Sequence, residues 1–169
     1  MRLKQPALNR TLKIVSGGQT GVDRAALDAA LELGVPCGGW CPDGRSAEDG
    51  PLPIKYPLRE IKGGGYVERT LANVRDSDGT AIIHAGELEG GTLQTREFCV
   101  ENDRPHLLVD SQEVPVAKAA DLIAGFVKRH RIITLNVAGP RASKQPQIYA
   151  YAHAAITRLL QSAPNGANL

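Results

Sequence analysis

The sequence predicts an α/β fold, a doubly wound domain in which helices cover both faces of a mainly parallel sheet of five or more strands. Short apolar runs typical of buried parallel strands alternate along the chain with longer segments of helical periodicity. Strands separated by helices pair in parallel through right-handed crossovers. A chain of 169 residues fits one domain, which we expect to span residues 1–169 with an ordered core of about 11–162.

Five strands are expected, at residues 11–16, 35–40, 79–85, 106–110 and 132–139. Five helical segments lie between and after them, and each presents one inward face. In the first helix the inward residues are Val22, Ala25, Ala26, Ala29, Ala30 and Leu33, and in the second they are Val67, Thr70, Leu71 and Val74. In the third helix they are Thr95, Phe98 and Cys99. In the fourth they are Val116, Ala119, Ala120, Ile123, Phe126, Val127 and His130, and in the fifth they are Ile148, Tyr151, Ala152, Ala155, Ile156 and Leu159. Residues 41–65 form one long irregular stretch, which is typical of a lid, a binding loop or a disordered segment.

Composition argues against several classes of protein. A formal net charge of +2, with one tryptophan, four tyrosines and two phenylalanines, does not suit a nucleic-acid-binding surface. No apolar run approaches the ~20 residues that a membrane span needs, and the first residues lack the apolar core of a secretory signal. We therefore expect a cytoplasmic protein that binds neither nucleic acid nor membranes.

The three cysteines, Cys37, Cys41 and Cys99, are an odd number, and no second ligand pair at zinc-finger spacing accompanies them. We expect free thiols and no metal site.

Ligands bind an open parallel sheet beyond the carboxyl ends of its strands. The segments that leave the five strands are GGQTG, CPDGRSAEDG, GELEGGT, DSQE and GPRASKQP. These segments predict the binding edge. The acidic segment 76–79 enters a strand instead, so we expect a polar turn there and no catalytic pair.

The first of these segments, Gly17, Gly18, Gln19, Thr20 and Gly21, is predicted to bind an anion. Its glycines allow backbone N–H groups to approach a ligand, and the following helix offers its positive end. The segment is no Walker A loop, because no Gly-Lys-Ser/Thr follows. An alternative is that Thr20 and Asp23 form a capping box while the glycines only make a tight turn, although a cap does not exclude an anion site.

A second glycine-rich helix start, Gly90, Gly91 and Thr92, follows the third strand. Two such helix starts on one edge would flank a shared crevice, as a ligand with a phosphate and a second polar end requires.

Cationic side chains are expected at the same edge. They are Arg45 in the long stretch, Arg69 near the start of the second helix, and Arg141 and Lys144 after the fifth strand. A guanidinium binds phosphate bidentately, which favours the arginines as ligand contacts. Asn136 and Ser143 would add neutral hydrogen bonds.

Candidate catalytic groups are few. His84 ends the third strand, Glu97 lies in the third helix, and Glu48 and Asp49 lie in the long stretch. No Ser–His–Asp order and no metal-ligand cluster stands out. The sequence supports a binding crevice more than a catalytic site.

Six motifs in one order resemble the molybdenum-cofactor carrier protein family. They are GGQTGVDRAALDAA, GWCPDGRSAEDGPLP, YPLRE, ERTLANVRDSDGTAII, GGTLQT and NVAGPRASKQPQI, and the resemblance extends from Lys13 to about Leu160. This family is similar to a wider superfamily of Rossmann-like nucleotide-ligand proteins. That superfamily includes the phosphoribohydrolases once misnamed lysine decarboxylases.

The resemblance implies a Rossmann-like, homo-oligomeric carrier (dimer or tetramer) of a small phosphorylated ligand. That ligand is the molybdenum cofactor (molybdopterin), a pterin dithiolene with one phosphate and an oxo-molybdenum head. The implied ligand contacts are the GGQTG segment, the GGT turn and the loop 136–144, which includes Gly139.

Two alternatives stay open: a nucleoside-monophosphate phosphoribohydrolase and a regulatory nucleotide-binding module. The phosphoribohydrolases carry P-G-G-x-G-T-x-x-E, which supplies a catalytic glutamate. Glu97 holds the comparable place in EGGTLQTRE, but the proline and the third glycine are absent.

Overall fold

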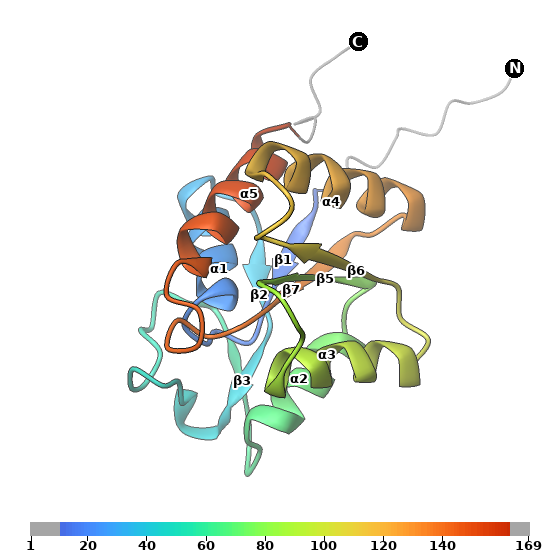
Figure 1. Cartoon of the computed structure of the whole chain (residues 1–169). Helices are drawn as coiled ribbons and strands as arrows, with labels where there is room; N and C mark the ends of the chain where they lie inside the picture. Colours follow the sequence, from blue (N-terminus) through green and yellow to red (C-terminus); the bar gives the residue numbers. More distant parts are fainter. Residues whose placement is uncertain (1–10, 163–169) are drawn as a thin grey trace, which may run out of the picture.

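The computed structural model describes residues 11–162, and at its centre lies a five-stranded sheet in which every pair of neighbouring strands is parallel (Figure 1). The strands lie in the order β2-β1-β7-β5-β6. Their bounds are β1 Lys13–Val15, β2 Cys37–Gly38, β5 Gly79–His84, β6 His106–Asp110 and β7 Thr134–Ala138. The predicted mainly parallel sheet is confirmed, and four of its five strands lie where the sequence predicts them.

Helices cover both faces of this sheet, as the sequence predicts. In Figure 1, α1, α4 and α5 lie together on one face, and α2 and α3 lie on the other. Their bounds are α1 Val22–Glu32, α2 Tyr66–Arg75, α3 Gly90–Glu101, α4 Val116–His130 and α5 Ile148–Ser162. None of the helices between residues 11 and 162 combines the length and the apolar character that crossing a membrane requires.

The strand order locates the crevice of the fold. If β7 and α5 are counted first, the order β2-β1-β7-β5-β6 becomes 3-2-1-4-5, which is the order of a Rossmann-type sheet. The central strand is then β7. Helix α5 leaves β7 on one face, and α3 leaves β5 on the other, so a crevice forms beyond the carboxyl ends of these two strands.

The two faces of the sheet differ in polarity. Ala81, Ile83, Leu135 and Val137 point to the face of α1, α4 and α5 and belong to the main apolar core. Because side chains alternate along a strand, Thr80 and Asn136 point to the opposite face, where Asn136 Nδ2 donates to Thr80 Oγ1 at 3.2 Å. Helices α2 and α3 also bury polar side chains, namely Arg69, Asn73, Thr92 and Thr95. A polar layer therefore lies between the sheet and α2 and α3.

The expected second strand, 35–40, is divided between two sheets. Gly39 has a φ of 127° and turns the chain away after β2. Trp40 then begins β3 (Trp40–Pro42), which pairs in parallel with β4 (Arg59–Ile61) in a separate two-stranded sheet. The expected single strand was wrong because glycine permits a turn that periodicity does not reveal.

The segment 41–65 is ordered, although one of the expectations for it was disorder. After β3 it forms a short 3-10 turn, Asp43–Arg45, and it ends with β4 and a tight turn into α2. The Arg45 guanidinium donates at 2.9–3.1 Å to four carbonyl oxygens of the same segment, those of Leu52, Pro53, Tyr56 and Leu58. A second apolar cluster under the segment consists of Leu27, Cys41, Leu52, Tyr56 and Leu58.

Three residues predicted to face inward are exposed. Leu33 follows the end of α1, Val67 lies on the outer face of α2, and His130 ends α4. Helix α2 instead buries Arg69 and Asn73 together with Val74. Periodicity could not show this, because it assigns apolar residues to the inside, whereas this helix packs on a polar layer.

The acidic segment 76–79 is a polar turn, as predicted. Asp76 follows the end of α2, and the Asp78 carboxylate accepts hydrogen bonds from the N–H groups of Ile133 and Thr134 at 3.0 and 2.9 Å. The three cysteines are free thiols, and Cys41 and Cys99 are fully buried.

Candidate functional site

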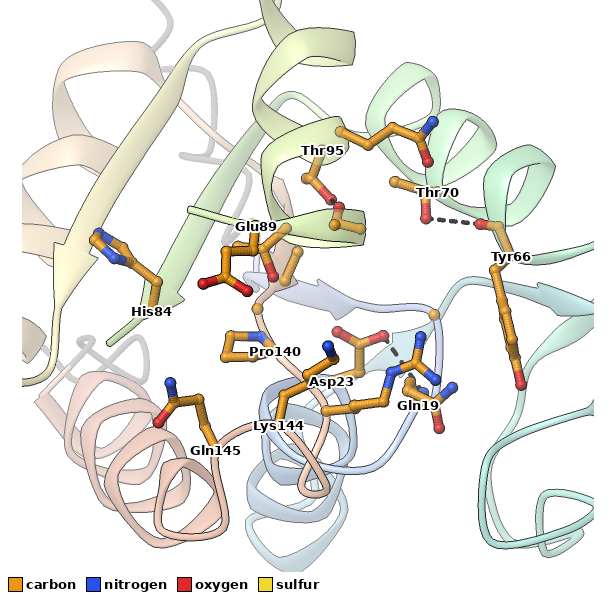
Figure 2. A pocket seen from close by; sticks show the side chains of 18 of the residues that line it. Gln19, Asp23, Tyr66, Thr70, His84, Glu89, Thr95, Pro140, Lys144 and Gln145 are labelled. Carbon is orange, nitrogen blue, oxygen red and sulfur yellow. Dashed lines mark hydrogen bonds between the residues drawn. The ribbon is translucent and has the colours of Figure 1, made fainter. Parts of the chain in front are cut away.

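A polar pocket of about 330 Å³ occupies the crevice between β7 and β5 (Figure 2). Four parts of the chain line it: the β1–α1 connection, the inner face of α2, the β5–α3 connection with the start of α3, and the β7–α5 connection. Figure 2 shows an elongated site, with Gln19 and Tyr66 at one end, His84 and Gln145 at the other, and Glu89 between them. The pocket thus lies at the sheet edge that the sequence predicts.

Three of the five backbone N–H groups of the GGQTG segment are hydrogen-bonded within the chain. The N–H of Gly18 donates to Ser16 Oγ at 3.4 Å, that of Gln19 to Asp23 Oδ2 at 3.4 Å, and that of Thr20 to Gln19 Oε1 at 3.0 Å. The protein's own oxygen atoms therefore already accept hydrogen bonds from these three N–H groups. The segment presents Gly17 and the side chain of Gln19 to the pocket.

The other three residues of GGQTG bind neighbouring segments. A side chain at Gly18 would collide with Leu52 and Leu58, and one at Gly21 with the backbone of the β7–α5 connection. The Thr20 hydroxyl donates to the Glu48 carboxylate and accepts the N–H of Ala142 at 3.1 Å. The predicted capping box of Thr20 and Asp23 is wrong, because Gly21 holds the cap position of α1 and no side chain bonds there.

A buried ion pair forms one wall of the pocket. Arg69 Nη1 lies 3.1 Å from Asp23 Oδ2, and the two residues are 8% and 7% exposed. The guanidinium lies directly against Gly17, where any side chain would overlap it. Burial raises the pKa of Asp23 to about 6, and the Arg69 charge opposes this rise.

The N-terminus of α3 opens into the pocket. Gly90 and Gly91 line it, and a Cβ at either position would meet no atom within 4 Å. The Glu89 carbonyl accepts the N–H groups of Thr92 and Leu93 at 3.1 and 3.2 Å. An anion can therefore approach the first N–H groups and the positive end of this helix closely.

The β7–α5 connection supplies cations. Gly139, Arg141 and Lys144 line the pocket. The Arg141 guanidinium lies 5.6 Å from the centre of the Tyr66 ring and 4.0 Å from the Glu48 carboxylate. Glu48 also accepts hydrogen bonds from the backbone N–H and the hydroxyl of Ser143, so it joins this connection to the segment 41–65.

The structure brings most of the predicted site residues together. Those that line the pocket are Gly17, Gln19, Arg69, Gly90, Gly91, Thr92, Asn136, Gly139, Arg141 and Lys144. Gly18, Thr20, Gly21, Arg45 and Glu97 are not among the lining residues. Arg45 is engaged by the four carbonyl oxygens described above, which corrects its expected place at the ligand. Glu97 is exposed on α3.

Sequence reasoning placed Arg69 at this edge but missed the other pocket residues of α2 and the acids before α3. Tyr66, Thr70 and Asn73 line the pocket with Arg69, as do Glu87 and Glu89. Their signal in the sequence is the spacing of Tyr66, Arg69, Thr70 and Asn73, which places them on one helical face. Such a polar face is ordinarily assigned to solvent.

The pocket is richer in hydrogen-bond donors than in groups suited to catalysis. Its donors include Gln19, Arg69, Asn136, Arg141 and Lys144. The His84 ring lies in the same pocket, with Nδ1 2.7 Å from the carbonyl oxygen of Gly86, so Nδ1 must carry a hydrogen. Among residues 11–162, no group of three or more histidine, cysteine, aspartate or glutamate side chains is placed to hold a metal ion. Three cations (Arg69, Arg141 and Lys144) and three carboxylates (Asp23, Glu87 and Glu89) line the pocket, which suits a polar ligand that carries an anionic group.

Comparisons with known proteins agree with this fold. Residues 14–160 match the model of cpYpsA, the circularly permutated YpsA SLOG family. The chain is similar to the crystal structure of the "Putative molybdenum carrier protein" from Syntrophus aciditrophicus SB, at 45% sequence identity over 89% of this chain and 96% of that one, with a TM-score of 0.87. None of the curated proteins compared with the chain matches it.

Proposed function

The chain belongs to the circularly permutated YpsA SLOG family, and from this premise we propose that it carries a phosphorylated, pterin- or nucleotide-like ligand in the crevice between β7 and β5. The ligand we favour is the molybdenum cofactor. Two facts support this choice: the sequence motifs resemble the cofactor carriers, and the similar solved structure is named as a molybdenum carrier protein.

The observation that carries the proposal is the open N-terminus of α3. Gly90 and Gly91 line the pocket with open space where a Cβ would stand, and Lys144 and Arg141 line the same cavity. A helix N-terminus with nearby cations is a suitable site for one phosphate. We therefore assign the phosphate of the ligand to this end and leave a structural role to the GGQTG segment, in which three of the five N–H groups are already bonded.

The size and lining of the pocket fit the rest of the ligand. A volume of about 330 Å³ is at the lower end of the range for small-molecule sites. The side chains of Gln19 and Asn136 offer neutral hydrogen bonds to the oxygen and nitrogen atoms of a heterocycle. We assign protein contacts to the phosphate and the ring system only, and none to the molybdenum.

We favour carriage over N-glycosidic hydrolysis because of the place of Glu97. This glutamate is exposed on α3, outside the lining of the pocket, and so has no contact with a ligand held there. A homo-oligomeric state and a cytoplasmic location stay predictions from the sequence.

The test is the capture of the isolated molybdenum cofactor by the purified full chain under anaerobic conditions. We expect the protein to slow oxidation of the cofactor saturably and to retain it through gel filtration. Gly91→Asp places a carboxylate at the N-terminus of α3, where space is open and a negative charge stabilises the helix. Like charges would then repel the phosphate, and we expect affinity to fall by about tenfold or more.

Gly91→Ala is the matched control, since it fills a similar position without charge. Its affinity should stay close to that of the unmodified chain. Absence of saturable protection by the unmodified chain, or equal affinities for the two variants, would contradict the proposal.

A further inference from the structure

The side-chain amide of Gln19 has an orientation that its hydrogen bonds determine. One terminal atom accepts the N–H of Thr20 at 3.0 Å and the N–H of Glu48 at 2.9 Å. An atom that accepts from two N–H donors must be the amide oxygen, Oε1. The other terminal atom is therefore Nε2, which carries two hydrogens to donate.

Nε2 of Gln19 is buried and has no hydrogen-bond partner within the described residues 11–162. The residue is 6% exposed and lines the pocket. A buried donor without an acceptor is costly, and in native proteins such a group usually has an explanation. A ligand atom that accepts a hydrogen bond at this end of the pocket would remove the cost.

The charges around Gln19 are balanced before any ligand arrives. Arg69 is paired with Asp23 at 3.1 Å, and Arg141 lies 4.0 Å from the Glu48 carboxylate. Both guanidinium groups also lie near the face of the Tyr66 ring, at 5.4 and 5.6 Å from its centre. A neutral acceptor suits this end of the pocket better than a second phosphate would.

The two ends of the site are separate. Figure 2 places Gln19 and Tyr66 at one end, away from Glu89, which precedes the first turn of α3. A ligand whose phosphate lies at α3 would thus reach Gln19 with its ring system. Tyr66 lines the same end, with the two guanidinium groups near its ring.

We propose that Gln19 determines ligand specificity by donating from Nε2 to a ring carbonyl, so that the crevice selects keto heterocycles over their amino counterparts. The proposal rests on the proposed function, because it assumes that the phosphate lies at the N-terminus of α3. It adds the chemical class of the ring: a lactam-type heterocycle with an exposed oxygen.

The experiment uses two matched pairs of probes that differ in one ring substituent. The first pair is inosine 5′-monophosphate, with a ring carbonyl, and adenosine 5′-monophosphate, with an amino group in its place. The second pair is 6-hydroxymethylpterin and its 4-amino analogue. Binding to the full chain is measured by titration calorimetry, and inorganic phosphate serves as a competitor for the nucleotides.

We expect the unmodified chain to bind the keto member of each pair about tenfold more tightly, because an amino group leaves the buried donor unpaired. Gln19→Glu keeps an oxygen for the N–H groups of Thr20 and Glu48 and replaces only Nε2 with an acceptor. This variant should lose or reverse the preference. Gln19→Met, which removes both functions, should lose it without reversal.

The outcomes separate the two proposals. Equal affinity of the unmodified chain for both members of each pair, or an unchanged ratio in Gln19→Glu, overturns the role of Gln19 even if phosphate competes. If neither the probes, nor phosphate, nor the molybdenum cofactor binds, the proposed function fails as well. Because the preference of the unmodified chain is itself a test, the proposal is decided even if a variant does not fold.

Discussion

At the scale of single residues, Asp23 has a role that its place in the sequence does not suggest. Its carboxylate accepts the N–H of Gln19, pairs with Arg69 and is almost fully buried. It thus occupies the position where an anion would meet the GGQTG segment. A protein carboxylate holds this segment in shape, and the proposed phosphate site is the other helix start.

The pH dependence of stability should report on this carboxylate. Burial raises the pKa of Asp23 from 3.8 to about 6, so the folded chain holds the proton more tightly than the unfolded chain does. Stability therefore falls as the pH rises from about 4 to about 6 and is then level with respect to this group. The side chain of Asp23→Asn cannot ionise. This variant should therefore lack the decrease in the free energy of unfolding, on the order of 2 kcal/mol, that the unmodified chain shows between these pH limits. Urea unfolding at pH 4.5 and pH 7 measures it.

Asp49 offers a control, because the pKa of its carboxyl is shifted in the opposite direction to that of Asp23. Its hydrogen bond with Arg24 lowers the pKa of its carboxyl, so the stability that Asp49 contributes is lost as the pH falls. Asp49→Asn should therefore leave the decline between pH 4 and pH 6 in place. An Asp23→Asn variant with the same pH profile as the unmodified chain would contradict the assignment.

The residue types in the sequence predicted which residues line the pocket better than they predicted what each residue does there. Arg69 and Arg141 were expected there as cations, and both line the pocket. The sequence could not show that Arg69 is paired with Asp23, which lies 46 positions away. Nor could it show that Gln19 holds two N–H groups and leaves one donor free, because this depends on Glu48 from a distant segment.

At the scale of elements, the segment 41–65 depends on one side chain. Arg45 donates to four carbonyl oxygens and has a φ of 55°, a left-handed conformation that costs a non-glycine residue free energy. The four hydrogen bonds offset this cost. The binding edge therefore contains a segment whose form is set by an arginine and not by regular secondary structure.

Arg45→Ala should unfold this segment locally. Four carbonyl oxygens lose their donor, and we expect a loss of about 2–4 kcal/mol in the free energy of unfolding. Limited proteolysis by thermolysin should then cut near Leu52 and Leu58 first. Lys62→Ala, an exposed change within the same segment, is the control and should leave both readouts unchanged. Equal protease resistance of the two variants would show that Arg45 is not needed.

The elements themselves were predicted to different degrees. The strands at β5 and β7 were predicted because each is a mainly apolar run between polar turns. Helix α2 was predicted as an element, but its inner face was not, since Arg69 and Asn73 are buried there in place of Val67. The expected inner face follows apolar periodicity, and a helix that packs on polar groups does not obey it.

At the scale of the whole molecule, the strand order 2-1-7-5-6 relates this chain to a Rossmann-type sheet by moving β7 and α5 to the front. The start of β1 and the end of α5 lie on the same side of the molecule in Figure 1. Alternation of strands and helices predicted the fold class. It could not predict this order, because order depends on which strands pair and not on which residues form them.

A circularly permuted variant of the chain tests the relation to a Rossmann-type sheet. The natural ends are joined, and new ends are opened between α4 and β7, at residues 131–133. We expect cooperative unfolding and unchanged ligand affinity, because neither the strand pairs nor the pocket is altered. Opening the chain between β5 and α3 instead, at residues 85–89, should abolish binding, since this connection lines the pocket. Loss of folding in the first rearrangement would contradict the relation.

The carboxylate of Glu48 bonds both Thr20 and Ser143, and this has a kinetic consequence. The segment 41–65 is already attached to two of the loops at the pocket, so it need not close over an arriving ligand. Tyr66, Gly91 and Lys144 line the pocket and also reach the surface. In the proposed function, release of the ligand would then need no opening of this segment. The residence time of the cargo would follow its affinity directly.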